Sequence, residues 1–359
     1  MAMDAFSASL MKDKREIVIA PTIYKFDTFD AFAEEFQLGE RDVVLTNEFI
    51  YKPFMEKLGL KSNFVFQEKF GAGEPSEAMI ETMYEAIPYD SYDRVIAVGG
   101  GAIMDLCKLL GCKRPSSVHE LYFKREPVVH EKEVIAIPTT CGTGSEVTPF
   151  AVITDHKTGY KYPITDYALT PSVAIVDPVL ARTQPRKLAS DAGFDALTHS
   201  MEAYVSVYAN DFTDGMALHA AKLIWDNLAE SVNGEPGLAK TNAQEKMHNA
   251  ATMAGMAFGS AFLGMCHGMA HTIGALCHIA HGRTNSILLP YVIRYNGQIP
   301  EEPTSWPKYN KYIAPERYQD IARNLGIDTG KTPAEAVENL AKAVEDYRDN
   351  KLGMNKSFQ

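Results

Sequence analysis

The stretch Arg94-Val-Ile-Ala-Val-Gly-Gly-Gly-Ala-Ile-Met-Asp105 joins a predicted strand to a predicted helix through three glycines. The β-branched run Arg94–Val98 indicates a buried strand, and the apolar spacing through Leu110 indicates a helix. Gly99, Gly100 and Gly101 would then expose backbone N–H groups at the positive end of that helix, where phosphates bind. The pattern is neither the GxGxxG fingerprint nor a Walker loop, and a triple glycine can also be a simple tight turn.

Further strands and helices alternate around this stretch. Residues 42–46, 63–66 and 134–137 are β-branched or aromatic runs that predict strands, and Ser76 is a good N-cap for a helix over residues 77–87. Strands that alternate with helices are typical of a parallel sheet covered by helices. The first half of the chain is therefore predicted to be an α/β domain.

A second glycine-containing loop, Pro138–Glu146, follows the strand over residues 134–137. It carries hydroxyl groups on Thr139, Thr140, Thr143 and Ser145. Two polar loops that each follow a strand suit a pyrophosphate and ribose ligand at the carboxyl edge of the sheet. The alternative is a pair of ordinary loops with capping hydroxyls.

The pattern changes after about residue 181, with a boundary between Arg182 and Lys187. Long amphipathic segments predict an all-helical second domain. We therefore predict an α/β dinucleotide-binding domain over residues 1–181 and a helical metal-binding domain over residues 182–359. The helices are expected over residues 192–208, 212–231, 243–261 and 264–280.

Histidines in the helical half form a pattern suited to a metal. His267 and His271 are four residues apart, as are Asp195 and His199, and His281 follows. Residues four apart lie on one face of a helix. One carboxylate with several imidazoles suits Fe(II) or Zn(II). Each element alone could be a buried core histidine or a surface contact, but their combination with nearby glycines favours a metal site.

Composition limits the class of protein. A net charge of −11 over 359 residues argues against nucleic acid and anionic membranes as partners. Five cysteines without a CxxC pair indicate no disulfide framework, so we expect the cytoplasm. The first twenty residues have no apolar core of signal length, and no stretch reaches the length of a membrane span.

Four motifs together resemble the iron-containing (group III) alcohol dehydrogenases, over about residues 20–330. They are GGGAIMD (99–105), PTTCGTGSEVTPFAVITD (138–155), DALTHSMEAY (195–204) and HGMAH (267–271) with the later His281. The resemblance implies a Rossmann-like N-terminal domain and an all-helical C-terminal domain, as in dehydroquinate synthase. It also implies Fe(II), or Zn(II), as the metal, NAD or NADP as the cofactor, and a homo-oligomer.

The resemblance also assigns residues. It implies Asp195, His199, His267 and His281 as metal ligands, and places His271 near substrate and nicotinamide. The residues it implies for the cofactor are Asn47, Gly99, Gly100, Gly101, Asp105, Thr139, Thr140, Thr143, Ser145, Val152 and Lys161.

Two parts of the chain resemble different members of this family. Residues 25–148 resemble 4-hydroxybutyrate dehydrogenases, whereas the later segments resemble the alcohol dehydrogenase domain of aldehyde-alcohol dehydrogenases. Two features depart from the usual pattern. Asn47 stands where many NAD-specific members have Asp, which leaves NAD or NADP open, and the chain ends near Phe358, short of the usual final helices.

The expected function is the interconversion of a short primary alcohol and its aldehyde by hydride transfer. A 4-hydroxybutyrate dehydrogenase, which reduces succinic semialdehyde, is the alternative. A dehydroquinate-synthase-like lyase would want more cations than Lys161 and Arg283, and a metal or nucleotide sensor without activity is the third alternative.

Overall fold

A computed structural model describes residues 17–71, 73–123, 125–301, 312–354 and 356–358 of the chain. They form two compact units, one ending at Gln184 and the other beginning at Pro185. This division falls inside the segment where the sequence pattern changes. The N-terminal residues 1–16, where no signal sequence is expected, lie outside the described residues.

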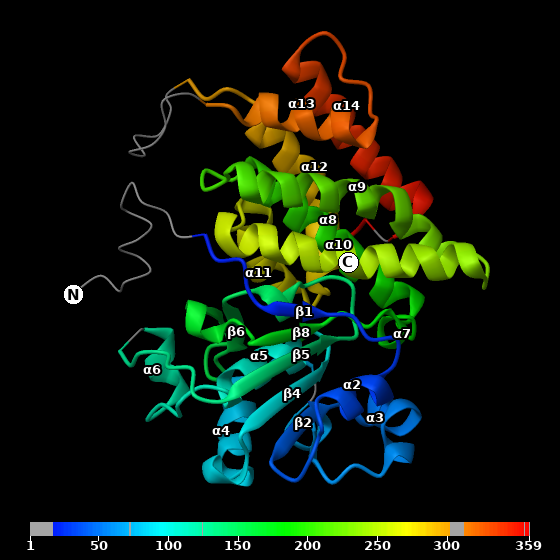
Figure 1. The fold of residues 1–359 in the computed structure, drawn as a ribbon. Coiled ribbons are helices and arrows are strands. Elements are labelled where there is room, and N and C mark those ends of the chain that lie inside the picture. Colours follow the sequence, from blue (N-terminus) through cyan, green and yellow to red (C-terminus); the bar gives the residue numbers. More distant parts are fainter. Residues whose placement is uncertain (1–16, 72, 124, 302–311, 355, 359) are drawn as a thin grey trace. The chain divides into compact units, whose positions relative to one another are not determined.

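The first unit is built on a parallel sheet of six strands in the order β1-β8-β5-β4-β2-β3 (Figure 1). All four strands predicted from the sequence are present. The strands are β1 (Thr22–Tyr24), β2 (Asp42–Thr46), β3 (Asn63–Phe66), β4 (Arg94–Gly99), β5 (Glu133–Pro138) and β8 (Val173–Ile175).

Helices cover both faces of this sheet because alternate strand residues point to opposite sides. Val43 and Leu45 pack in one core with α4 and α5, whereas Val44 packs in the other with α2 and α3. Ser76 caps α4, as predicted, by accepting a hydrogen bond from the backbone N–H of Met79. The helices are α2 (Phe29–Glu35), α3 (Glu48–Phe54), α4 (Glu77–Ala86), α5 (Gly101–Leu110), α6 (Val118–Tyr122) and α7 (Pro178–Ala181), with 3-10 turns at Glu56–Leu58, Gln67–Lys69, Tyr89–Ser91, Ser145–Val147 and Tyr167–Leu169.

One element of this unit was not predicted. Strands β6 (Phe150–Thr154) and β7 (Lys161–Thr165) form an antiparallel hairpin that is separate from the six-stranded sheet. The hairpin carries Val152 and Lys161, two of the residues that the resemblance implies for the cofactor.

The second unit contains only helices among its described residues, as expected (Figure 1). The first helix begins at Arg186 rather than at residue 192. The fourth ends at Cys277, because His278 takes a left-handed conformation with φ of 53°. The helices are α8 (Arg186–Val205), α9 (Asp211–Asn233), α10 (Leu238–Ala261), α11 (Met265–Cys277), α12 (His281–Asn296), α13 (Ala314–Leu325) and α14 (Pro333–Asp346), followed by a π-helical turn over Tyr347–Lys351.

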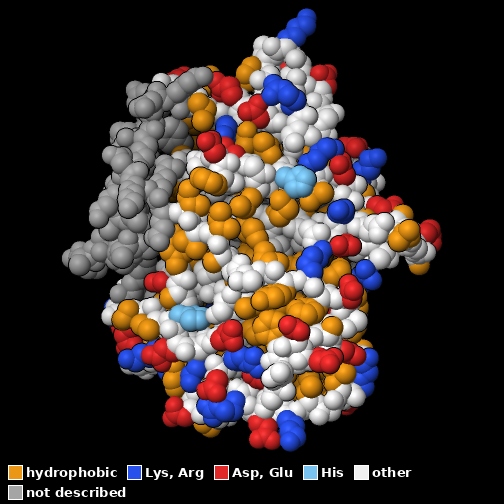
Figure 2. Space-filling model, viewed as in Figure 1, with side chains coloured by type: hydrophobic (Ala, Val, Ile, Leu, Met, Phe, Trp, Pro, Cys, Tyr) orange, Lys and Arg blue, Asp and Glu red, His pale blue; other side chains and the backbone are white. Residues whose placement is uncertain are grey.

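Three further features concern the thiols, the helix lengths and the charged surface. All five cysteines are free thiols. None of the described helices combines the length and the apolar character that a membrane span needs. Acidic and basic side chains are interspersed on the face shown in Figure 2.

Candidate metal centre and nucleotide-binding edge

The middle of α8 carries Asp195 and His199 on one buried face. They are one helical turn apart, and Asp195 Oδ2 lies 3.9 Å from His199 Nε2. Both residues are less than a tenth exposed. A buried carboxylate requires compensation by positive charge or by hydrogen-bond donors, and here imidazoles surround it.

Two further imidazoles reach Asp195 from α11 and α12. His267 Nε2 is 3.4 Å from Asp195 Oδ1, and His281 Nε2 is 3.6 Å from the same oxygen. Ligand atoms of these three residues all lie within 4.8 Å of one another. The His199 ring stacks on the His267 ring, with centroids 4.5 Å apart. The three predicted imidazole ligands therefore surround the carboxylate of the fourth, Asp195.

Glu202, one turn after His199 on α8, fixes the orientation of His267. Its carboxylate lies 2.6 Å from His267 Nδ1 and accepts hydrogen bonds from the backbone N–H groups of Cys266 and His267. Nδ1–H therefore donates to Glu202, and Nε2 is the ring nitrogen that faces Asp195. A carboxylate behind a metal-binding histidine sets its tautomer and raises its basicity. Glu202 was not among the residues predicted from the sequence.

Asn285 is a second residue that sequence reasoning missed. Its amide nitrogen lies 2.7 Å from Asp195 Oδ1, 3.0 Å from His267 Nε2 and 3.2 Å from His281 Nε2. It stands four residues after His281 on α12, the same one-turn spacing that identifies the other pairs. That spacing was the available signal.

Charges at the cluster favour an anionic carboxylate. Burial alone would raise the pKa of Asp195, but His199, His281 and His267 outweigh it and hold that pKa well below the usual range. Burial opposes charge on His267 as well, yet its contacts with Asp195 and Glu202 raise its pKa to about 9. Without a cation the cluster therefore holds a proton on His267. A divalent cation would displace that proton, so the donors fit a metal such as Fe(II) or Zn(II).

His271 lies beside the cluster without belonging to it. It follows His267 by one turn on α11, and its ring centroid is 5.0 Å from that of His281 and 6.4 Å from that of His267. His278, which ends α11, is exposed and is not part of the group formed by Asp195, His267 and His281.

Glycines let the helices that carry the ligands approach closely. A Cβ atom on Gly282 would lie 2.0 Å from the carbonyl oxygen of Asp191 and 3.1 Å from Cβ of Asp195. A Cβ atom on Gly264 would lie 2.9 Å from a Glu202 carboxylate oxygen. A larger residue would not fit at either position without a shift of its neighbours, so both glycines are needed for this packing.

In the first unit, the predicted phosphate loops follow adjacent strands. Gly99 ends β4, Gly100 is the N-cap of α5, and Gly99 pairs in register with Pro138 at the end of β5. Asn47 follows β2, which is the other neighbour of β4. The chain leaves β2 toward β3 and returns to β4 on the opposite side, so the order reverses between β2 and β4. Nucleotides bind at such a switch point in open parallel sheets.

The two loops pack tightly against each other. A Cβ atom on Gly100 would lie 3.3 Å from Cγ2 of Thr140, and one on Gly101 would lie 2.9 Å from Cγ2 of Thr143. Thr139 donates its backbone N–H to the carbonyl of Gly99. The buried hydroxyl of Thr140 has no hydrogen-bond partner among the described residues. The loops thus combine glycine backbone, which carries no side chain, with the buried hydroxyl of Thr140, which has no hydrogen-bond partner among the described residues.

Hydrogen bonds join Asp105 to Ser145 and to Val152, three of the residues that the resemblance implies for the cofactor. Asp105 accepts a hydrogen bond from the Ser145 hydroxyl at 2.8 Å and from the backbone N–H of Val152 at 2.9 Å. This arrangement braces the second loop and the hairpin against α5. Lys161 lies farther along the hairpin, with Nζ 2.6 Å from Glu74. Asn47 donates its amide to Gln67 at 3.4 Å.

Lys108 is a buried cation beneath the second loop, and sequence reasoning missed it. Its Nζ lies 2.7 Å from the Ser145 hydroxyl and 2.6 Å from the Phe150 carbonyl. Burial lowers the pKa of Lys108 to about 8 against the opposing charges of Asp105 and Glu146. Its position three residues after Asp105 in the helix was the only hint.

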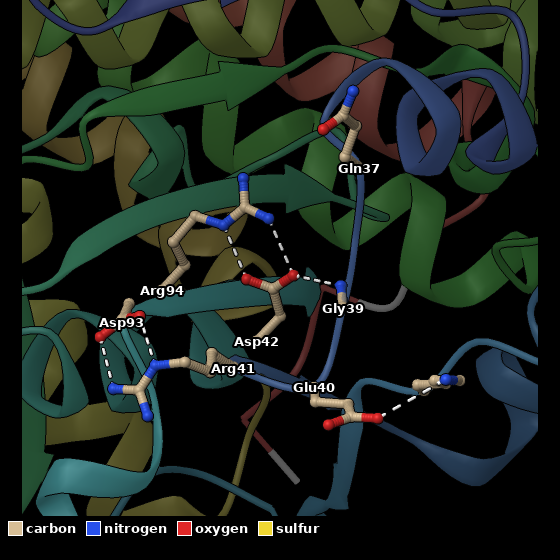
Figure 3. Close-up of a pocket in the computed structure, with 8 residues that line it drawn as sticks. Gln37, Gly39, Glu40, Arg41, Asp42, Asp93 and Arg94 are labelled. Atoms are coloured by element: carbon tan, nitrogen blue, oxygen red, sulfur yellow. Dashed lines mark hydrogen bonds and ion pairs between the residues drawn. The ribbon is translucent and has the colours of Figure 1, made fainter.

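A hollow of about 540 Å³ at the amino ends of β2 and β4 does not compete as a functional site (Figure 3). Arg94 binds Asp42 through two hydrogen bonds, and Arg41 binds Asp93. Its charged groups therefore neutralise one another. It also lies at the edge of the sheet opposite to the glycine loops.

Comparisons with known proteins agree with this geometry. The model of the iron-containing alcohol dehydrogenases matches residues 21–178, and that of the Fe-containing alcohol dehydrogenase family, C-terminal, matches residues 189–359. The aldehyde-alcohol dehydrogenase of Streptococcus pneumoniae is 48% identical over 85% of this chain, which spans only 36% of that protein. The 4-hydroxybutyrate dehydrogenase of Clostridium kluyveri is 34% identical over 92% of this chain and 91% of its own length.

Solved structures give the same answer. The sulfoacetaldehyde reductase of Bifidobacterium kashiwanohense in complex with NAD⁺ has a TM-score of 0.79 and 26% identity, over 96% of this chain and 87% of that one. The fold predicted from the sequence, a Rossmann-like unit with an all-helical unit, is confirmed. The chain belongs to the iron-containing alcohol dehydrogenase family.

Proposed function

We propose that the chain is an NAD(P)-dependent, metal-dependent alcohol dehydrogenase that interconverts a short primary alcohol and its aldehyde. The observation that carries the proposal is the buried cluster of Asp195, His267 and His281, backed by Glu202. Such a donor set suits a Lewis acid, which can polarise a carbonyl or stabilise an alkoxide.

The proposed ligands are Asp195, His199, His267 and His281, with Fe(II) as the metal and Zn(II) as the alternative. Asp195 supplies the negative charge, and Glu202 keeps His267 in the tautomer that leaves Nε2 available. Asn285 positions Asp195 through a hydrogen bond of 2.7 Å. The family name supports iron, and the nitrogen and oxygen donors also accept zinc.

The proposed cofactor site is the edge formed by the two glycine loops. Gly99, Gly100, Gly101, Thr139, Thr140 and Thr143 would hold the pyrophosphate and ribose, while Asp105, Ser145 and Val152 brace them. The NAD⁺ complex of the sulfoacetaldehyde reductase supports NAD. Asn47 follows β2 without a charge that would repel a 2′-phosphate, which keeps NADP as the alternative. The nicotinamide would exchange the hydride.

His271 is proposed to relay the proton that the nascent alkoxide needs. Its ring lies 5.0 Å from that of His281, close to the cluster but outside it. An imidazole can both accept and donate a proton, so it can connect the site to solvent. Packing against the nicotinamide is the alternative role.

The proposed substrate is a short, uncharged aldehyde. Arg283 is the cation nearest to the histidines in sequence, and it is committed to Asp191, with Nε 2.9 Å from Oδ1. A carboxylate-bearing substrate would need a cation of its own. The second candidate is succinic semialdehyde, because the 4-hydroxybutyrate dehydrogenase matches this chain over nearly its whole length.

The cellular setting is also proposed. The family resemblance supports a homo-oligomer, and the free cysteines support the cytoplasm. The negative charge argues against nucleic acid and membrane partners. Because the chain spans about a third of the length of the aldehyde-alcohol dehydrogenases it matches, their combined activities are not transferred to it.

The test is the oxidation of NADH and NADPH with a panel of aldehydes, before and after reconstitution with Fe(II) or Zn(II). We expect butyraldehyde and acetaldehyde to give metal-dependent turnover, with a higher kcat/KM than succinic semialdehyde. A far higher value for succinic semialdehyde would establish the second candidate. No turnover with any aldehyde in the metal-loaded protein would point to a lyase or a sensor.

A further inference from the structure

We propose that the first unit holds a second divalent-cation site, formed by Glu77, Asp155 and His156. One ligand atom from each side chain lies within 4.8 Å of the others. Glu77 Oε2 is 3.6 Å from His156 Nδ1. Two carboxylates and one imidazole match the donors of Zn(II). This site shares no residue with the centre around Asp195.

The state of Glu77 provides independent support. Its side chain is 7% exposed, yet Oε2 accepts no hydrogen bond from any described residue. A buried carboxylate oxygen without a donor is costly. An ion pair with a protonated His156 would compensate part of this cost. A cation bound between the two residues would offset the charge of Glu77 directly, with the deprotonated imidazole of His156 as a second ligand.

The charges of Glu77 and Asp155 also act on the buried phenol of Tyr122. The Tyr122 hydroxyl has no hydrogen-bond partner among the described residues. Its burial, and then the charges of Glu77 and Asp155, raise the pKa of Tyr122. The same negative potential that disfavours a phenolate would attract a cation.

Local backbone structure fixes these side chains before any cation binds. Glu77 is the first residue of α4, held by the Ser76 cap. Asp155 follows β6 and accepts hydrogen bonds from the backbone N–H of Lys157 and the hydroxyl of Thr158. The backbone N–H of Thr154 donates to the Pro75 carbonyl at 2.9 Å, which joins the two segments. The site is therefore preorganised.

The distances suit a small cation with open coordination positions. Tetrahedral ligands at zinc are separated by roughly 3.3 Å, given bonds of about 2.0 Å, close to the 3.6 Å between Glu77 and His156. The His156 side chain is 46% exposed. Solvent can therefore reach the site and complete the coordination with water.

Occupancy would fasten the β6–β7 hairpin to α4. Lys161 of the hairpin already contacts Glu74, just before α4. The same hairpin carries Val152, whose backbone N–H binds Asp105 beside the proposed nucleotide loops. The cation would thus stabilise a segment that braces those loops, and its role would be structural.

The experiment counts zinc ions bound by the full chain after removal of metal with a chelator. Equilibrium dialysis with elemental analysis would compare wild type, Glu77→Gln and His156→Asn. His219→Asn, a change at an exposed histidine of α9, is the control. We expect both cluster variants to bind one zinc ion per chain fewer than wild type, and the control to match wild type.

Several results would overturn the proposal. Equal zinc content in wild type and His156→Asn would do so, because His156 is exposed and its loss leaves the fold intact. A loss in His156→Asn without a loss in folded Glu77→Gln would indicate a surface histidine acting alone. Adding His267→Ala to each protein keeps the two metal sites distinguishable, since the difference at His156 should persist in that background.

Discussion

Glu202 accepts a hydrogen bond from Nδ1 of His267 at 2.6 Å, and this contact directs the opposite ring nitrogen toward Asp195. The two residues come from α8 and α11, so the arrangement depends on how these helices pack. The packing of these two helices in the core therefore determines which ring nitrogen of His267 faces Asp195.

The change Glu202→Gln should weaken metal binding about 10–100-fold, the range seen when such supporting residues are lost. The amide would remove the negative charge that raises the basicity of His267. Competition with a chelator of known affinity measures the effect. Glu235→Gln, at an exposed glutamate, should leave affinity unchanged. If both variants bound metal equally well, Glu202 would be only a packing residue.

Replacing His267 by Ala should remove most of the bound metal, because one donor of a small set is lost and the others lose their geometry. Elemental analysis of the purified variant is the measurement. His278→Ala serves as the matched control, since His278 is exposed and ends α11. Full metal content in His267→Ala would show that the ligand assignment is wrong.

For His271→Ala, a proton relay predicts retained metal and cofactor with kcat reduced about 10²-fold. The pH profile of kcat should also change. Weaker binding of the cofactor with an unchanged profile would instead indicate packing against the nicotinamide. Loss of the metal would contradict both roles and would place His271 among the ligands.

Asn47→Asp should shift the preference toward NADH by about tenfold, equivalent to ~1.4 kcal/mol, because a carboxylate repels the 2′-phosphate of NADPH. The ratio of kcat/KM for the two cofactors measures the shift. Asn63→Asp introduces the same charge at the amino end of β3 and should leave the ratio unchanged. An unchanged ratio in Asn47→Asp would mean that Asn47 does not face the adenosine ribose.

Stability should rise with pH above about 8 because of Lys108. The folded pKa is about 8 and the reference value is 10.5, so the unfolded chain binds more protons between these values. The cost of burying the charge is fully present below pH 8 and disappears as pH rises through the reference value. Relative to Lys108→Met, wild type should gain roughly 3 kcal/mol at full titration, measured by urea unfolding at several pH values. A difference that is constant with pH would show that Lys108 titrates normally.

The sequence predicted the elements that local pattern determines. The runs over β2, β3, β4 and β5 are continuous and β-branched, and periodicity identified the helices of the second unit. The β6–β7 hairpin was missed because residues 161–165 include Pro163 and a weak alternation. β8 was missed because a strand of only three residues leaves too short a pattern to recognise.

Some residues of the candidate site could likewise be predicted from local spacing, and others could not. The pairs Asp195–His199 and His267–His271 are visible because one turn of helix separates their members. Glu202 and Asn285 were missed because their roles depend on contacts between helices. Glu202 lies 65 residues before His267, and Asn285 lies 90 residues after Asp195. No local pattern encodes these two long-range contacts, although the one-turn spacing from His281 was a local sign of Asn285.

Gly282 adds a consequence for how this protein can evolve. Because a Cβ atom there would lie 2.0 Å from a backbone carbonyl of α8, any side chain would push α12 away from α8. Such a change would move His281 relative to Asp195 without altering either ligand. In a library of variants aimed at new substrates, tolerance at this scaffold position should therefore be lower than at Tyr291 or Tyr295, which are exposed on the same helix.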